Sequence, residues 1–319
     1  MAEVLAGAPP RAMRGTAERR FSRAAWGVLA YNILVVLWGA YVRATGSGDG
    51  CGNNWPLCRG VMVPHAPEAQ TIIEFTHRIS VLLAMGAVLG LAVWAFRVFP
   101  RGHRARFFSV LSLAFFFVEA LLGAGLVLFR YVAHNASAGR AAYLSAHLVN
   151  TQVLLAMLIL AAWFGGSAER RAWRRPGKAI LAALPVALLV AVSGAIAALG
   201  DTLFPASSLA SGMQQELAGT ASALLRLRAL HPVLAVGGGA FLLIAAVSAR
   251  RSGLPAAVHW STIVALLVVV QLVAGALNLL LLAPVWMQIC HLLLADLLWV
   301  ALVITVLEMG QWRFEAGQG

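Results

Sequence analysis

Eight long apolar runs, spread along the whole chain, restrict this sequence to one class of fold. They lie at 24–42, 71–99, 107–129, 141–164, 179–199, 229–247, 260–282 and 285–307. Each is close to the roughly 20 residues that an α-helix needs to cross a ~30 Å hydrocarbon core. Charged residues make up only 11% of the chain, whereas soluble domains carry roughly 25%. The sequence therefore predicts an all-α integral membrane protein with eight transmembrane helices.

The basic residues that flank these runs are distributed unevenly between the two sides of the membrane. One side carries 17 of them, within 11–23, 97–106, 170–178, 250–251 and 313, and the other carries Arg43, Arg59, Arg130, Arg140, Arg226 and Arg228. Because Lys and Arg are retained on the cytoplasmic side, we predict a multi-pass protein of the plasma membrane with both termini cytoplasmic. This bias, together with the anionic lipid of the bilayer, explains the net charge of +12 without nucleic-acid binding. Residues 1–23 hold no apolar core, so we expect no cleavable signal peptide.

The first four runs and the last four share landmarks. The matched positions are Gly39 with Gly194, Gly123 with Gly275, His77 with His231, and His147 with His291. An even number of spans gives both copies the same orientation, so the pattern predicts two four-helix bundles related by a pseudo-two-fold axis along the membrane normal. We expect a cytoplasmic tail at 1–23, the N-terminal bundle at 24–165, a cytoplasmic linker at 166–178, the C-terminal bundle at 179–309 and a second tail at 310–319.

Four histidines lie near the non-cytoplasmic ends of the even-numbered runs: His77, His147, His231 and His291. A single intramembrane histidine usually serves helix packing, but four at one depth, paired by the repeat, favour a ligand role. Two imidazoles that face each other across a bundle have the geometry of bis-histidine haem ligation. A di-iron site would need further Glu-x-x-His motifs, and zinc or copper would need tighter clusters or thiolates.

Ionisable residues inside the runs are functional-site candidates by default. Glu74 stands three residues before His77, which places both side chains on one helix face. Glu74 is therefore a candidate functional residue; the alternative is a structural hydrogen-bonding role beside Arg78. The second copy has Arg228 in the position of Glu74. For Glu119, in the third run, a proton relay and a neutral carboxyl sealed between helices both stay open.

The loop between the first two runs, on the non-cytoplasmic side, contains Cys51 and Cys58. This side is oxidising, so the pair favours a disulfide over two free thiols. Glycines at 46, 48, 50 and 52 predict a backbone that turns tightly or lies against something bulky.

Together, these features resemble the haem A synthase family. The specific matches are Arg-Ala-Thr-Gly-Ser-Gly from Arg43, then Cys51-x6-Cys58 containing Trp-Pro-Leu-Cys, and Glu74-x-x-His77-Arg78. The resemblance implies an oxidoreductase that converts the ring methyl of haem O to the formyl of haem A for cytochrome oxidase. It also implies that His77 and His147 hold the substrate haem, that His231 and His291 hold a haem b for electron transfer, and that Glu74 is catalytic.

The chain departs from some relatives because it lacks a second cysteine pair between the fifth and sixth spans. We expect haem propionates to contact arginines near the non-cytoplasmic side, although these could instead lie among lipid headgroups; the candidates are Arg43, Arg78, Arg226 and Arg228. The family suggests haem O synthase and cytochrome oxidase assembly factors as partners and leaves the electron acceptor unidentified. One alternative function is a non-enzymatic di-haem b-type electron carrier. Another is a transporter built from parallel repeats.

Overall fold

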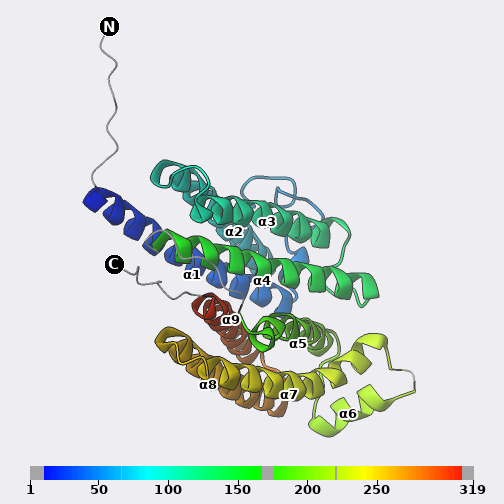
Figure 1. Ribbon diagram of the computed structural model, residues 1–319. Helices are drawn as coiled ribbons and strands as arrows, with labels where there is room; N and C mark the ends of the chain where they lie inside the picture. Colours follow the sequence, from blue (N-terminus) through cyan, green and yellow to red (C-terminus); the bar gives the residue numbers. More distant parts are fainter. Residues whose placement is uncertain (1–10, 66, 167–175, 220, 311–319) are drawn as a thin grey trace.

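A computed structural model describes residues 11–65, 67–166, 176–219 and 221–310, and most of these are helical (Figure 1). The helices are α1 (Arg11–Ala44), α2 (Ala69–Val98), α3 (Arg104–Leu128), α4 (Ala138–Gly166), α5 (Lys178–Leu203), α6 (Leu209–Leu217), α7 (Ala223–Arg250), α8 (Pro255–Leu280) and α9 (Val285–Met309), with a 3₁₀ turn, η1, at Ser47–Asp49. Within these residues, eight helices are long and apolar enough to cross a membrane. The prediction of an all-α protein with eight membrane-spanning helices is confirmed.

The helices extend past most of the apolar runs that predict them. The largest extension is in α1, which begins at Arg11, inside the segment predicted as an N-terminal tail. Hydrophobicity marks the part of a helix within the hydrocarbon, but backbone hydrogen bonding continues into the polar flank. Residues 1–10, 167–175 of the predicted linker and 311–319 of the predicted C-terminal tail lie outside the described residues.

The membrane-spanning helices form two groups of four (Figure 1). In the first, α1, α2, α3 and α4 pack in a ring, so that α2 and α4 occupy opposite corners. In the second, α5, α7, α8 and α9 form a similar ring, with α7 and α9 opposite each other. These rings contain the spans of the two predicted bundles; the pseudo-two-fold axis that would relate them stays a prediction.

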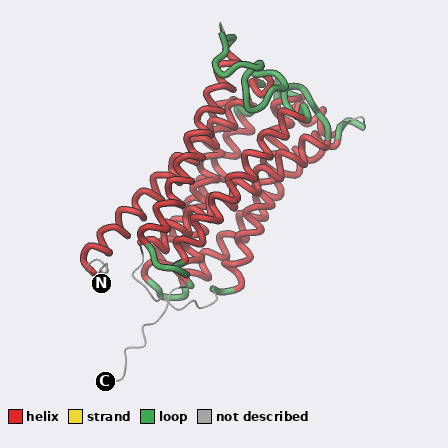
Figure 2. Tube along the Cα trace, turned by 90° about the horizontal axis from the view of Figure 1, so that it is seen from above, coloured by secondary structure: helices red, strands yellow, loops and turns green. Residues whose placement is uncertain are grey.

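The long helices run in a common direction, and their connections lie at the two ends of the molecule (Figure 2). We call the end that bears residues 44–68 the disulfide end. Because α1 begins and α9 ends at the opposite end, the chain crosses the bundle an even number of times between them.

The two rings share one interface, in which α4 and α9 are the most buried spans. Leu155 and Leu158 of α4 are fully buried there, in the same apolar cluster as Val303 and Leu307 of α9. The indole of Trp299 donates a hydrogen bond to the carbonyl of Gln152, 2.8 Å away. The two groups of helices are therefore packed through a continuous core.

A buried polar pair interrupts this apolar interface. Gln152 Nε2 donates to Asp296 Oδ1 at 2.9 Å, and both side chains are buried. The other acceptors, Asp296 Oδ2 and Gln152 Oε1, have no hydrogen-bond partner among the described residues. A proton on Asp296 Oδ2 would let the carboxyl donate to Gln152 Oε1, so that two hydrogen bonds join the pair and both acceptors are satisfied.

Replacing Asp296 with Ala is expected to destabilise the protein by about 1–3 kcal/mol, because it leaves the buried Gln152 amide without a partner. Asp296→Asn should stay close to the wild type, since an amide can accept from Gln152 Nε2 and donate to Oε1. Thermal unfolding of the detergent-solubilised protein measures both. An Asn variant as unstable as the Ala variant would contradict a carboxyl that donates.

Candidate functional site

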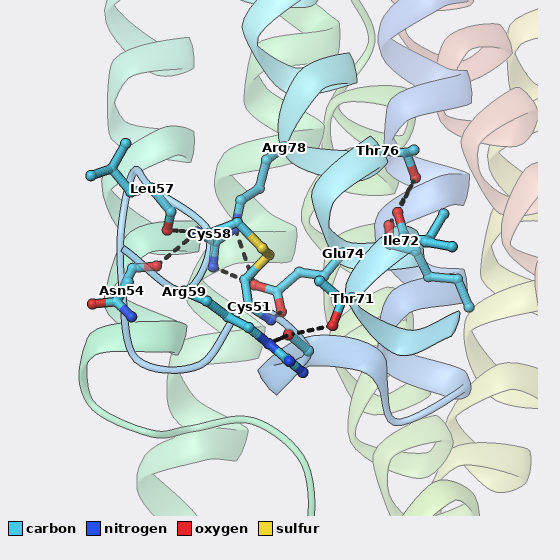
Figure 3. Close-up of a disulfide and its surroundings, with 12 residues drawn as sticks. Cys51, Asn54, Leu57, Cys58, Arg59, Thr71, Ile72, Glu74, Thr76 and Arg78 are labelled. Atoms are coloured by element: carbon cyan, nitrogen blue, oxygen red, sulfur yellow. Dashed lines mark hydrogen bonds and ion pairs between the residues drawn. A yellow bond between two sulfur atoms is a disulfide. The ribbon is translucent and has the colours of Figure 1, made fainter. Parts of the chain in front are cut away.

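The loop after α1 folds back onto the first turn of α2 (Figure 3). A disulfide joins Cys51 and Cys58, with an S–S distance of 1.97 Å, and both residues are buried. Thr71 Oγ1 donates to the carbonyl of Gly50 at 2.8 Å, and a Cβ on Gly50 would lie only 2.5 Å from the backbone of Gln70. Glycine at position 50 therefore allows the loop backbone to touch the α2 backbone, as the glycine pattern predicts.

Glu74 lies under this loop, and its carboxylate is hydrogen-bonded from two directions (Figure 3). The backbone N–H of Cys51 donates to Oε2 at 2.8 Å. Arg78 donates to Oε1 through Nε at 3.1 Å and forms an ion pair through Nη2. Arg78 also donates to the loop carbonyls of Asn54 and Leu57. Glu74, only 3% exposed, thus connects α2 to the disulfide loop.

The four histidines share one local environment. Each ring lies against a glycine of the preceding membrane-spanning helix: His77 against Gly39, His147 against Gly123, His231 against Gly194 and His291 against Gly275. A Cβ on the glycine would lie 3.0 to 3.9 Å from the nearest ring atom, Cε1. The repeat predicted from the sequence thus has a matching side-chain contact in both rings of helices.

Within each ring of helices, the two histidines lie on helices at opposite corners: His77 on α2 with His147 on α4, and His231 on α7 with His291 on α9. Buried Nδ1 atoms of His77, His147 and His291 have no hydrogen-bond partner among the described residues. His231 Nδ1 lies 2.9 Å from Ser193 Oγ, which leaves Nε2 for another bond.

These donors fit haem better than a metal held by protein alone. The described residues contain no group of three or more His, Cys, Asp or Glu side chains able to surround an ion. A bis-histidine haem needs only two imidazoles, because the porphyrin supplies the other ligands. His147 Nδ1 lies 3.3 Å from Glu119 Oε1, and His291 Nε2 lies 3.3 Å from Gln271 Nε2. Each of the four rings still keeps at least one nitrogen without a hydrogen bond to a described residue, so two opposed pairs of histidines fit two haem groups.

Glu119 lies beside His147, a placement that its position in the sequence alone does not reveal. Its Oε1 is 3.3 Å from His147 Nδ1, and its Oε2 accepts from Asn150 Nδ2 at 2.6 Å. The hydroxyl of Thr151 also contacts the carboxylate. The matching residue in the second ring is Gln271, whose Nε2 donates to the carbonyl of His291 at 3.1 Å. The sequence does contain one signal for this placement: Glu119 and Gln271 each stand four residues before a glycine that contacts a histidine.

The four arginines predicted to contact propionates are all bonded to protein groups. Arg43 donates to Ala198, Thr202 and Gln288 across the interface between the rings. Arg228 is paired with Glu216 and Asp201, and Arg226 donates to the carbonyl of Gly219. Arg78 is paired with Glu74, so each of the four arginines already has a protein partner. A propionate would have to bind an arginine that also keeps this partner.

Comparison with known proteins identifies a family over most of the membrane-spanning region. The sequence model of the COX15-CtaA family, described as "Cytochrome oxidase assembly protein", matches residues 22–303. A Thermus thermophilus protein named "Protoheme IX farnesyltransferase" is 46% identical over 314 residues, which are 96% of this chain and 52% of that protein. A "Heme A synthase" from an Exiguobacterium species is 31% identical over 160 residues, 50% of this chain and 51% of that one. Another, from Shouchella clausii, is 41% identical over 97 residues, 30% of this chain and 32% of that one. The chain spans about half the length of the Thermus relative.

Proposed function

The chain belongs to the COX15-CtaA family of cytochrome oxidase assembly proteins, and we propose that it is a haem A synthase, an oxidoreductase that converts the ring methyl of haem O to the formyl of haem A. Relatives with that name support the activity. The observation that carries the proposal is an asymmetry between two otherwise similar histidine pairs. Buried Glu74 stands one helical turn before His77, whereas Arg228 stands before His231.

In this proposal, the ring of α1 to α4 binds the substrate. His77 and His147 hold haem O from opposite sides, and Glu74 accepts the proton that leaves as the methyl group is oxidised. The apolar surroundings of this pair suit a substrate with a farnesyl tail. The Thermus relative is named for farnesyl transfer to protohaem; we do not extend that activity to this chain, which spans only about half of that protein.

The ring of α5 and α7 to α9 has the supporting role. His231 and His291 would hold a haem b, which supplies an electron sink when bound. Arg228 pairs with Glu216 and Asp201 and so offers no base beside this pair. We propose that the substrate is oxidised in the first ring of helices and that His231 and His291 of the second ring would hold the group that accepts electrons.

We further propose that the protein lies in the plasma membrane with the disulfide end on the outer face. The basic residues of 97–106 and 250–251 are at the opposite end, which the positive-inside rule assigns to the cytoplasm. We also propose haem O synthase or cytochrome oxidase assembly factors as partners.

Pigment extraction from cells that also make haem O tests the function. An enzyme should convert haem O to haem A when this protein is produced, and cells with the empty vector should not. A non-enzymatic electron carrier, the alternative function, would bind haem b and leave haem O unchanged, which would refute the proposal.

Glycine substitutions test the histidine sites. Gly39→Ala places a Cβ 3.0 Å from His77 Cε1, and overpacking of this kind costs about 1–3 kcal/mol. We expect haem retention in the first ring of helices to fall by roughly tenfold, and Gly194→Ala to have the same effect beside His231. Absorbance of bound haem after gel filtration measures both. Gly27→Ala, on α1 with nothing within 4 Å, is the control and should behave like the wild type; a loss there would contradict the steric explanation.

A further inference from the structure

A pocket lies at the opposite end of the molecule from the disulfide. It has a volume of about 740 Å³ and is formed where α2 ends, α3 begins and α4 passes beside them. Phe96 near the end of α2 is 19 residues from His77, which is roughly 30 Å along a helix. The pocket is therefore separate from the histidine sites and independent of the proposed function.

One part of the pocket wall is strongly basic. Arg101, Arg104 and Arg106 line it together with His103, and none of the lining residues is acidic. None of the three arginines forms an ion pair with any residue that the structure describes. The start of α3 is also here, with no acidic residue in its first turn to offset the helix dipole. This wall is suited to an anionic group.

The rest of the wall is apolar and holds two of the arginines in place. The guanidinium carbon of Arg106 lies 4.1 Å from the ring centre of Phe96, and that of Arg104 lies 5.1 Å from the ring centre of Phe164. Phe164 also stacks on Phe108 at 5.4 Å. Contacts with aromatic faces position a guanidinium group without neutralising it, so its N–H groups stay available to an acceptor.

We propose that this pocket binds an anionic phospholipid of the adjacent leaflet, with its phosphate between Arg101, Arg104 and Arg106. The acyl chains would lie on the apolar wall formed by Phe107, Leu160 and Phe164. A free phosphate would account for the arginines but not for the apolar wall, whereas an amphiphile with a negative headgroup accounts for both. At this end of the bundle, such a lipid is supplied by the bilayer itself.

Lipid binding to the purified full-length protein tests this proposal, with phosphatidylglycerol as the probe and phosphatidylcholine as the neutral comparison. Native mass spectrometry counts retained lipid. We expect clear preference for phosphatidylglycerol, and Arg104→Gln with Arg106→Gln to weaken it at least tenfold. Arg250→Gln with Arg251→Gln removes the same charge at the same end, outside the pocket, and should change little. An equal loss in this control, or no preference for the anionic lipid, would overturn the proposal.

A second variant separates a lipid from a simple anion. Leu160→Trp fills the apolar part of the pocket and leaves the arginines unchanged, so retention of phosphatidylglycerol should fall. Competition by inorganic phosphate should be weak in the wild-type protein. If phosphate displaces the lipid completely, or if Leu160→Trp binds it normally, the pocket is an anion site and the lipid assignment is wrong. Circular dichroism confirms that each variant keeps its helices.

Discussion

Haem A formation is expected to fall by about 10²–10⁴-fold when Glu74 is replaced with Gln, the range typical of a lost general base. Glutamine keeps the size of the side chain and can still accept the hydrogen bond that Cys51 N–H donates at 2.8 Å. It cannot take up a proton from the substrate. The ratio of haem A to haem O in extracts measures the effect, and the absorbance of the purified variant shows whether haem still binds.

A matched control separates this role from the structural alternative. Glu68 lies at the same end of the protein, and its carboxylate is exposed beside Arg59 at 3.8 Å; Glu68→Gln should leave haem A formation unchanged. Arg78→Gln should weaken the attachment of the disulfide loop while keeping the Glu74 carboxylate, so some activity should remain. Full activity in Glu74→Gln would refute the acid/base assignment.

The disulfide loop is hydrogen-bonded to Glu74 and Arg78. The sequence predicts the Cys51–Cys58 pair and the Glu74–His77 spacing as separate features. In the structure they are one, because Cys51 donates its backbone N–H to the carboxylate and Arg78 connects Glu74 to the loop carbonyls. A carboxylate buried in an apolar segment needs such donors, because burying a charge without hydrogen-bond partners is costly.

The membrane-spanning helices are predictable from the sequence, because a run of about 20 apolar residues has few other stable folds. The start of α1 at Arg11 is not predictable in this way, since residues outside the hydrocarbon carry no hydropathy signal. The Gln152–Asp296 pair is equally hidden: each residue is a single polar position on its own helix, and only the packing of α4 against α9 brings them together. Pairwise contacts between distant helices depend on tertiary packing, which periodicity does not encode.

The contacts around the histidines show the same limit. The sequence repeat matches Gly39 with Gly194. Only the structure shows why glycine is needed there: a histidine ring lies against each of them. The sequence shows that Glu119 is an acid within a membrane span, but it does not show that Glu119 contacts His147. Glu74, one helical turn before His77, and Glu119, which faces His147, both belong to the first ring of helices, and Arg228 and Gln271 replace them in the second. This difference agrees with a reaction confined to the first ring.

Replacing His291 with Ala is expected to remove haem b from the second ring of helices and to leave the substrate site able to bind haem. The substitution removes an imidazole that would hold the haem, and loss of an outer-shell partner alone already costs about 10–100-fold in metal affinity. Bound haem b should therefore fall at least about 10-fold.

His147→Ala should produce the reverse pattern, with haem b retained and haem O not held. Reduced-minus-oxidised difference spectra, followed by pigment extraction, distinguish the two losses. His259→Ala is the control, because its ring packs on Trp260 near the start of α8, far along the helix from Gly275. An unchanged spectrum in His291→Ala would refute the ligation scheme. Loss of both haem groups in either variant would mean that the two sites are not independent. The proposal that the two rings of helices have separate roles would then be wrong.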